Sequence, residues 1–283
     1  MPTILSIQSS VAYGHVGNSA ATFPLQRLGI EVYPVLTVHF SNHSGYGEWR
    51  GPLLSPEDVA GVIQGIDERG ALSKVDAVLS GYLGDGRVGQ VVLDAVAQVK
   101  NYNDKAIYVC DTVFGDVGRG VYARPGIPEF FRDHAVSVAD IVTPNHFELN
   151  FLTGTESTDL GSLLGAANAL RARGPKVVLV TSAILSADQD HITLVAVSAK
   201  GAWKISTPKL PRDFTGSGDI TAALFLGSYL NSGGDVPRAL ETTTNVVYSL
   251  LKRTHELGWR ELALVPAQEE IINPTYQFEA ERL

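Results

Sequence analysis

The chain has 283 residues, of which 45% are hydrophobic and 18% charged, and its formal net charge at pH 7 is −8. This length is enough for one full α/β core. The acidic balance, without a basic cluster, disfavours partners such as nucleic acid and anionic membranes. A single cysteine, Cys110, excludes an internal disulfide. We predict a cytoplasmic protein, because the N-terminal residues do not resemble a signal peptide and no apolar run approaches the ~18 residues of a membrane span.

Short β-branched runs alternate with longer helical patterns as far as Thr181. The expected strands are Thr3–Gln8, Ile30–Leu36, Ala77–Ser80, Ala106–Cys110, Asp140–Thr143 and Val177–Thr181. The expected helices are Asn18–Leu28, Pro56–Glu68, Arg87–Lys100, His146–Thr153 and Leu160–Arg173. This alternation predicts βαβ units, and therefore an α/β fold whose mostly parallel central sheet has helices on both faces.

The pattern changes after Thr181. The runs Ile192–Val197 and Ala202–Thr207 flank a short polar turn, which predicts an antiparallel hairpin at a sheet edge. The helices expected after it are Ile220–Leu230 and Val236–Thr254. No linker or repeat divides the chain, so we expect a single domain over residues 1–283. The polar, glycine-containing stretch 39–50 fits neither period and is expected to form a surface flap.

Residues 213–219, Asp-Phe-Thr-Gly-Ser-Gly-Asp, directly precede an apolar helical run. Gly216 and Gly218 allow close backbone approach to a ligand, and their amides lie with that of Ser217 at a helix N-terminus that attracts anions. A carboxylate beside such a site is unfavourable unless it takes a proton from the substrate. The segment therefore predicts phosphoryl transfer to a hydroxyl, with Asp219 as general base and the amides as an anion hole.

Other interpretations of the glycine-rich segments stay open at this point. On spacing alone, an ordinary helix N-terminus with a favourable acid explains residues 213–219 slightly better than catalysis does. Residues 84–89, Gly-Asp-Gly-Arg-Val-Gly, match a dinucleotide fingerprint, with Asp111 at the end of the next expected strand. The charged residues inside that motif suit a pyrophosphate loop badly, which argues against a nicotinamide-dependent oxidoreductase. Walker A, G-x-S-x-G, H-E-x-x-H and C-x-x-C patterns do not occur.

The segment Phe214-Thr215-Gly216-Ser217-Gly218-Asp219 resembles the signature of the ribokinase superfamily. Further motifs resemble the pyridoxal kinase branch of that superfamily and occur in its order. They are Ile7-Gln8-Ser9 with residues 13–19, residues 40–47, Ser80-Gly81-Tyr82, Cys110-Asp111 with Gly115-Asp116, and Thr143-Pro144-Asn145 with Glu148. Several co-linear motifs are more specific than any one of them. The resemblance implies a ribokinase-like three-layer sandwich.

The resemblance also implies an activity, the ATP-dependent phosphorylation of the 5′-hydroxyl of pyridoxal or a related B6 vitamer to give pyridoxal 5′-phosphate. Asp219 would deprotonate that hydroxyl. The residues implied to hold the vitamer are Ser9, His43, Ser44 and Tyr82. The family is homodimeric, so we expect a homodimer here.

A nucleotide and metal site follows from the same resemblance. Asp111 and Glu148 would organise Mg²⁺, with Thr143 near the phosphates or a monovalent cation such as K⁺. Mg²⁺ prefers few carboxylates together with waters and phosphate oxygens, and both acids fall just past expected strand ends. The residues implied to contact the nucleotide are Asp111, Asp116, Thr143, Glu148, Thr181, Ser182, Phe214, Thr215, Gly216 and Gly218.

Two positions depart from the family pattern, and they leave the substrate preference open. Thr112 stands where the family usually has Pro, and Ser44 stands where it often has Thr. Neither change removes a charged or proton-transferring group. The alternatives are a kinase for another hydroxymethyl heterocycle such as hydroxymethylpyrimidine, a sugar kinase, and a non-catalytic pyridoxal phosphate carrier. Ser9, Ser44 and Tyr82 favour an aromatic ring over a polyol.

Overall fold

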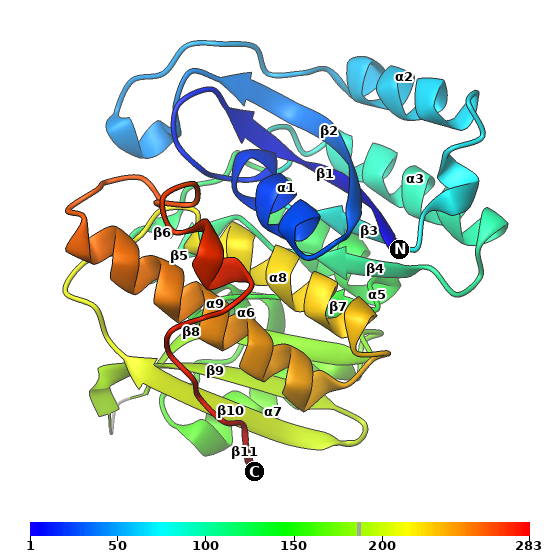
Figure 1. Cartoon of the computed structure of the whole chain (residues 1–283). Coiled ribbons are helices and arrows are strands. Elements are labelled where there is room, and N and C mark those ends of the chain that lie inside the picture. Colours follow the sequence, from blue (N-terminus) through cyan, green and yellow to red (C-terminus); the bar gives the residue numbers. More distant parts are fainter. Residues whose placement is uncertain (186–187) are drawn as a thin grey trace.

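The computed structural model describes residues 1–185 and 188–283 and contains a central nine-stranded sheet (Figure 1). The order of the strands in this sheet is β11-β10-β9-β8-β7-β4-β3-β1-β2. Their bounds are β1 (Thr3–Val11), β2 (Glu31–Phe40), β3 (Ala77–Ser80), β4 (Ile107–Cys110), β7 (Ile141–Val142), β8 (Val177–Leu185), β9 (Asp188–Ser198), β10 (Gly201–Pro208) and β11 (Glu281–Arg282). A separate small hairpin consists of β5 (Gly115–Asp116) and β6 (Gly120–Val121).

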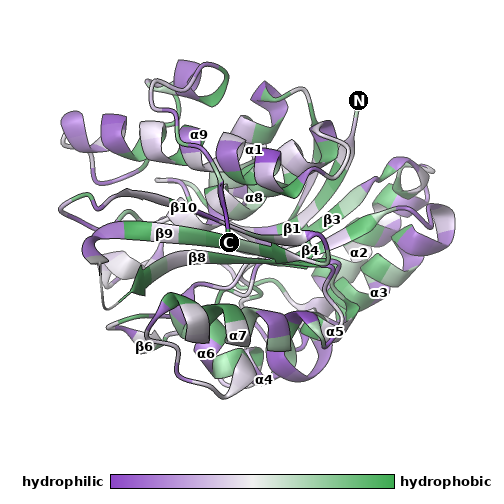
Figure 2. Ribbon diagram, turned by 90° about the horizontal axis from the view of Figure 1, so that it is seen from below, coloured by the Kyte–Doolittle hydropathy of each residue, from purple (hydrophilic) through white to green (hydrophobic). Residues whose placement is uncertain are grey.

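Helices cover both faces of the sheet, which makes three layers (Figure 2). On one face lie α1 (Asn18–Arg27), α8 (Ser217–Asn231) and α9 (Val236–Glu256). On the other lie α2 (Pro56–Asp67), α3 (Val88–Tyr102), α4 (Ile127–Phe130), α5 (Val136–Val138), α6 (His146–Thr153) and α7 (Leu160–Arg171). The predicted α/β sandwich is confirmed.

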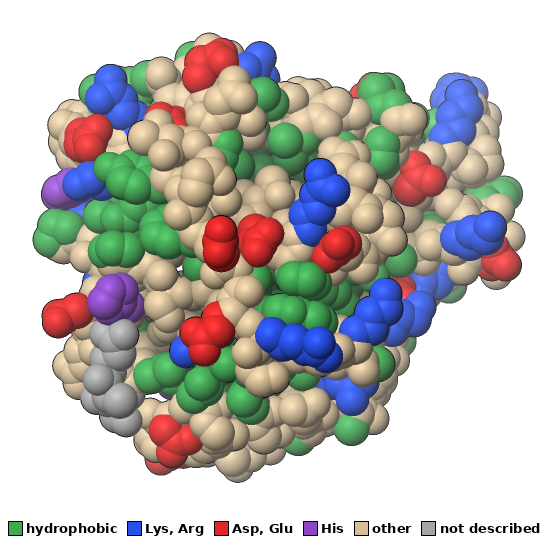
Figure 3. Space-filling model, turned by 60° about the horizontal axis from the view of Figure 1, so that its bottom comes forward, with side chains coloured by type: hydrophobic (Ala, Val, Ile, Leu, Met, Phe, Trp, Pro, Cys, Tyr) green, Lys and Arg blue, Asp and Glu red, His purple; other side chains and the backbone are tan. Residues whose placement is uncertain are grey.

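The hydrophobic core is divided by the sheet because successive side chains of a strand point to opposite faces. In β1, Leu5 and Ile7 pack with α2 and α3, whereas Ile4 packs with α1 and α8. All of these side chains are fully buried. The outer surface mixes acidic, basic and apolar side chains on the face shown in Figure 3. No helix in the described ranges has both the length and the apolar character to cross a membrane.

The direction of the strands aligns one edge of the sheet. β1, β2, β3, β4, β7 and β8 pair in parallel, so the carboxyl ends of neighbouring strands meet. Ligands of open α/β sheets bind at this edge. The predicted antiparallel hairpin is confirmed as β9 and β10. Its outer strand is not the sheet edge, however, because Trp203 and Lys204 of β10 pair with Arg282 and Glu281 of β11.

Some element bounds differ from the sequence prediction. β2 continues into the predicted flap because His39 and Phe40 still pair with Ser10 and Val11 of β1. β8 runs past Thr181 to Leu185 through an irregularity in its pairing with β9. α8 starts at Ser217, three residues before the predicted start, because Gly216 adopts a left-handed conformation (φ 87°) directly before it.

The glycines of residues 84–89 serve close packing. A Cβ atom on Gly89 would lie 2.5 Å from the ring of Phe130 in α4, so α3 and α4 approach each other through a missing side chain. The charged residues of the segment, Asp85 and Arg87, form an ion pair with each other at 2.7 Å. The dinucleotide interpretation therefore gains no support from the fold.

We expect Gly89→Ala to lower the free energy of unfolding by about 1–3 kcal/mol, because the added methyl group overpacks against Phe130. Gly61→Ala is the matched control, since Gly61 lies inside α2 with nothing within 4 Å of an added Cβ. Alanine's higher helix propensity should make that control more stable by up to ~1 kcal/mol. Denaturant unfolding measures both variants, and equal stabilities would contradict the packing role.

Candidate active site

Asp219 lies in the first turn of α8, directly after the glycine turn. The turn packs tightly: a Cβ atom on Gly216 would lie 2.0 Å from the carbonyl oxygen of His15. The Ser217 N–H donates to the carbonyl of Phe214 at 3.2 Å and closes the turn. The Gly218 N–H is unpaired within residues 1–185 and 188–283. A helix N-terminus with an unpaired amide and the positive end of the dipole attracts an anion.

The environment of Asp219 suits a general base. Burial raises the pKa of its carboxyl to about 6, and a hydrogen bond from the Gly17 N–H opposes that rise. Gly17 belongs to the turn between β1 and α1. A base works best when its pKa lies near the working pH, so this carboxylate can accept a proton at neutral pH.

Asp111 follows β4 at the carboxyl edge of the sheet and is only 4% exposed. The hydroxyl of Thr143, which follows β7, donates to its Oδ1 at 2.7 Å. Its Oδ2 is buried without a hydrogen-bond partner among the described residues. Burial, and then the charge of Asp219, raise the pKa of Asp111 to about 8. A buried, unpaired carboxylate oxygen is expensive unless a cation or donor reaches it.

Glu148 is anchored at the start of α6 by a capping box with Asn145. Its Oε1 accepts hydrogen bonds from the amides of Phe114 at 3.0 Å and Gly115 at 3.3 Å. The hydroxyl of Thr112 donates to Oε2 at 3.3 Å, so the departure from the family's Pro adds a donor. Burial raises the pKa of Glu148 well above its usual range, and the charge of Asp111 adds to this effect.

Asp111 and Glu148 are chemically compatible with Mg²⁺, the ion that the resemblance implies for them. No group of three or more His, Cys, Asp and Glu side chains is placed to hold a metal within the described part of the chain. Asp111 and Glu148 nevertheless offer two buried carboxylates, one with a free oxygen. Mg²⁺ usually takes only one or two carboxylates and completes its shell with waters and phosphates.

Tyr122 was missed by the sequence reasoning. It follows β6, and the charges of four acids act on its hydroxyl. Burial raises the pKa of Tyr122, and the charges of Glu148, Asp219, Asp116 and Asp111 raise it further. The β5–β6 hairpin is too short to produce a periodic pattern, so the sequence contains no signal for this placement.

Ser9 and Tyr82 are two of the residues that the resemblance assigns to the vitamer. Ser9 is 6% exposed, and a Cβ atom on Gly17 would lie 2.4 Å from its hydroxyl oxygen. Tyr82 follows β3 and is half-buried, and its carbonyl accepts a hydrogen bond from Thr37 at 2.7 Å. Burial raises the pKa of the Tyr82 hydroxyl.

The flap brings His43 and Ser44 to a short 3₁₀ turn, Ser44–Tyr46. Ser44 is exposed, whereas His43 is 8% exposed. Burial lowers the pKa of His43, and the neighbouring carboxylate of Glu261 opposes that change. Glu261 was not predicted as part of the site.

The predicted phosphate contacts occupy two segments. Thr181 is buried in β8, and its amide donates to the carbonyl of Pro144 at 2.9 Å. Ser182 is exposed and adopts a left-handed conformation, φ 52°. Asp116 is exposed in the β5–β6 hairpin, where its Oδ1 accepts from the amide of Val117 at 2.7 Å. Partial burial raises the pKa of Asp116, and the charge of Asp213, in the segment before the glycine turn, adds to this effect.

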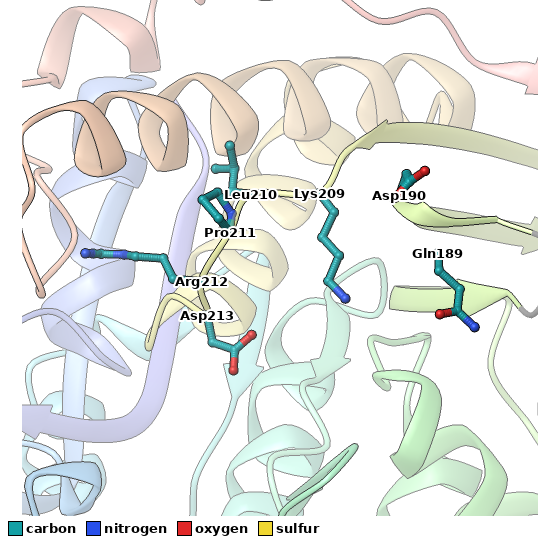
Figure 4. Close-up of a pocket in the computed structure, with 7 residues that line it drawn as sticks. All are labelled: Gln189, Asp190, Lys209, Leu210, Pro211, Arg212 and Asp213. Carbon is teal, nitrogen blue, oxygen red and sulfur yellow. The ribbon is translucent and has the colours of Figure 1, made fainter.

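A cavity of about 460 Å³ lies beside the glycine turn (Figure 4). It is formed by the start of β9 and by the loop that joins β10 to α8. The lining residues are Gln189, Asp190, Lys209, Leu210, Pro211, Arg212 and Asp213. Phe214 is outside this lining and packs under the guanidinium of Arg212, 4.6 Å from the ring centroid.

Comparisons with known proteins identify the family. The family model for phosphomethylpyrimidine kinase matches residues 59–264. The pyridoxal kinase PdxY of Rubrobacter xylanophilus is 53% identical over 282 residues, which cover 99% of this chain and 97% of the relative. The PdxY of Leifsonia xyli is 52% identical, with 99% of each chain covered. The chain belongs to the pyridoxal kinase family.

Solved structures agree with this assignment. The pyridoxal kinase of Leishmania donovani in complex with ADP and ginkgotoxin has a TM-score of 0.92 at 31% identity, with 100% of both chains covered. The same enzyme with ADP and pyridoxine has a TM-score of 0.91 at 30% identity, with 99% of both covered. The predicted family and fold are confirmed. The roles of individual residues stay predictions.

Proposed function

We propose that this kinase transfers the γ-phosphate of ATP to the 5′-hydroxyl of pyridoxal, pyridoxine or pyridoxamine. Relatives named pyridoxal kinase match almost the whole chain, and solved relatives bind ADP together with pyridoxine or pyridoxamine. The observation that carries the residue-level proposal is Asp219, a carboxylate with a pKa of about 6 next to an unpaired amide at a helix N-terminus.

Asp219 acts as the general base in this proposal. It takes the proton of the vitamer hydroxyl, and the oxygen forms its new bond to the γ-phosphorus while the bond from that phosphorus to ADP breaks. The negative charge on the transferring group is stabilised by the amides of Gly216 and Gly218 and by the dipole of α8. The Ser217 amide is assigned the same role, although its hydrogen bond to Phe214 would have to be shared or released.

Asp111 and Glu148 would hold Mg²⁺ in the ATP complex, directly or through waters. Mg²⁺ supplies positive charge that neutralises the phosphates and offsets the repulsion between these carboxylates. Thr143 orients Asp111 through its 2.7 Å hydrogen bond. A monovalent cation such as K⁺ would meet the phosphates near Thr143.

The remaining predicted residues complete the two substrate sites. The vitamer ring would lie between Ser9, Tyr82 and the flap residues His43 and Ser44. The hydroxyl of Ser9 makes no hydrogen bond within the described residues, which leaves it available to the ring.

The nucleotide phosphates would meet Asp116, Thr181, Ser182 and Thr215. The cavity of about 460 Å³ beside Asp213 would take the nucleoside end of ATP. We keep the homodimer as part of the proposal, and sedimentation analysis tests it.

Purified protein with Mg-ATP should phosphorylate at least one of pyridoxal, pyridoxine and pyridoxamine faster than hydroxymethylpyrimidine. The family model named for phosphomethylpyrimidine kinase makes that compound the necessary competitor. Coupled ADP release with product mass spectrometry measures each rate. Turnover of hydroxymethylpyrimidine alone would move the assignment to that substrate, and vitamer binding without ADP release would indicate a carrier.

Asp219→Asn should lower kcat at least ~100-fold, because an amide cannot accept the hydroxyl proton. Asp235→Asn is the matched control, an exposed acid that caps the next helix by accepting the amide of Arg238 at 3.2 Å. That control should keep the wild-type kcat. Steady-state kinetics at saturating ATP and vitamer compare the variants, and an Asp219→Asn enzyme with unchanged kcat would remove this residue from the chemistry.

The pH dependence should follow the same carboxylate. The base is active when deprotonated, so kcat/KM is constant above the Asp219 pKa of about 6 and falls about tenfold per pH unit below it. A pH profile between 5 and 8, with stability monitored at each pH, measures this. A flat profile down to pH 5 would place the base's pKa lower than the geometry indicates.

A further inference from the structure

Glu261 joins the flap to the rest of the molecule, although no predicted motif contains it. It follows α9 and is 8% exposed. Its Oε1 accepts a hydrogen bond from the hydroxyl of Tyr46 at 2.7 Å and lies 3.2 Å from Nε2 of His43. Its Oε2 accepts the amide of His15 at 3.1 Å. The carboxylate of Glu261 therefore accepts hydrogen bonds both from the flap and from the β1–α1 turn.

The hydrogen bonding of His43 fixes which ring nitrogen carries the proton. Its Nδ1 accepts the amide of Gly45 at 3.1 Å, so the neutral ring carries its proton on Nε2 and donates it to Glu261. A carboxylate only accepts hydrogen bonds, which matches three donors facing its two oxygens. The side chains of His43 and Glu261 are each only 9% exposed, so water competes little for this contact.

Arg260 and Leu262, the neighbours of Glu261 in the chain, contact the flap and the glycine turn respectively. The guanidinium of Arg260 lies 3.6 Å from the ring centroid of Tyr46 and donates to the carbonyl of Gly45 at 2.9 Å. Leu262 is 1% exposed, and its Cδ1 lies 3.3 Å from the position of a Cβ on Gly216. Residues 260–262 thus contact the flap on one side and the glycine turn on the other.

The β1–α1 turn has space for the carboxylate of Glu261 because it contains a glycine at the point of contact. Gly14 has φ +96°, and a Cβ atom there would lie 2.1 Å from Oε2 of Glu261. The same turn supplies the Gly17 N–H that hydrogen-bonds to Asp219. His15, which Glu261 contacts, is therefore two residues along the chain from Gly17, whose N–H lowers the pKa of Asp219.

We propose that Glu261 is a positioning residue of the phosphotransfer site. It keeps the flap residues His43–Tyr46, with Ser44 among them, in a fixed place relative to the turn that holds Asp219. Glu261 acts through His43, Tyr46 and His15 and contacts no reacting atom. The effect on the vitamer rests on the proposed function, in which the flap binds the vitamer ring.

Glu261→Gln is the direct test, because it keeps the size of the side chain while its NH₂ group cannot accept a hydrogen bond. At least one of the three donors then loses its partner. We expect the vitamer KM to rise about tenfold, the scale of one buried hydrogen bond, while the ATP KM and the melting temperature change little. Amide hydrogen exchange in residues 39–50 should become faster without any substrate present.

Two further variants, one weaker substitution and one control, are compared with Glu261→Gln. Tyr46→Phe removes a single donor, so it should raise the vitamer KM and flap exchange in the same direction by a smaller factor. It also carries the test if Glu261→Gln does not fold. Glu269→Gln is the matched control, an exposed glutamate whose partner is Arg27 at 3.1 Å, and it should behave as the wild type.

The outcomes separate this proposal from the proposed function. If the wild type phosphorylates no vitamer, the proposed function fails, and flap exchange alone decides the role of Glu261. Exchange in residues 39–50 that is equal in Glu261→Gln and Glu269→Gln overturns the proposal. An equal rise of the ATP and vitamer KM values together with a lower melting temperature also overturns the proposal, because that is the result expected if Glu261 only stabilises the fold. Faster flap exchange with a selective vitamer effect supports it.

Discussion

The site depends on one close contact, in which the N-terminus of α8 packs on the turn between β1 and α1. Gly216 can lie against the carbonyl of His15 only because it has no side chain, and the Gly17 N–H then reaches the carboxylate of Asp219. This contact joins the first strand of the sheet to a helix from the far end of the chain. It places the base and the unpaired amide of the glycine turn at the carboxyl edge where β4 and β7 deliver Asp111 and Thr143. The rest of the phosphate side is built around that junction.

Charge is the second constraint on this edge. The charge of Asp219 raises the pKa of Asp111, and the charge of Asp111 raises the pKa of Glu148. Burial raises the pKa of all three carboxyls. The fold counters this repulsion with fixed donors: the amides of Phe114 and Gly115 for Glu148, and the hydroxyl of Thr143 for Asp111. The remaining unpaired oxygen, Oδ2 of Asp111, is where added positive charge would stabilise the site most. In the proposed function, an acidic chain can therefore hold a polyanionic substrate without a basic surface, because amides and a cation would supply the positive charge locally.

The sequence could predict what local patterns determine. α6 has the predicted bounds because Asn145 and Glu148 form a capping box, and β3 has them because a short apolar run lies between loop residues. Asp219 was predicted from the residues because it opens a helix after a glycine turn, whereas Asp111 and Glu148 were implied by the resemblance to the family and lie just past expected strand ends. Long-range contacts were not predictable in this way. Glu261 meets Tyr46 across 215 positions of the chain, and no periodicity encodes that pairing. The extension of β8 was missed because Ser182 adopts a left-handed conformation that a strand pattern does not indicate.

The two sides of the site are held by different kinds of interaction. Asp111, Thr143 and Asp219 stand directly on strand ends and a helix, whose backbone hydrogen bonds fix them. At its base, the flap is joined to the β1–α1 turn through the backbone, where Ala12 and Tyr13 donate to the carbonyls of Phe40 and Ser41. Its tip is held by side chains, those of Arg260 and Glu261. Side-chain contacts can change by single substitutions without disturbing a strand or helix. If the proposed function holds, the residues of phosphate transfer are fixed by the sheet, whereas the choice of the acceptor ring can vary at the flap, where Ser44 replaces the family's more common Thr.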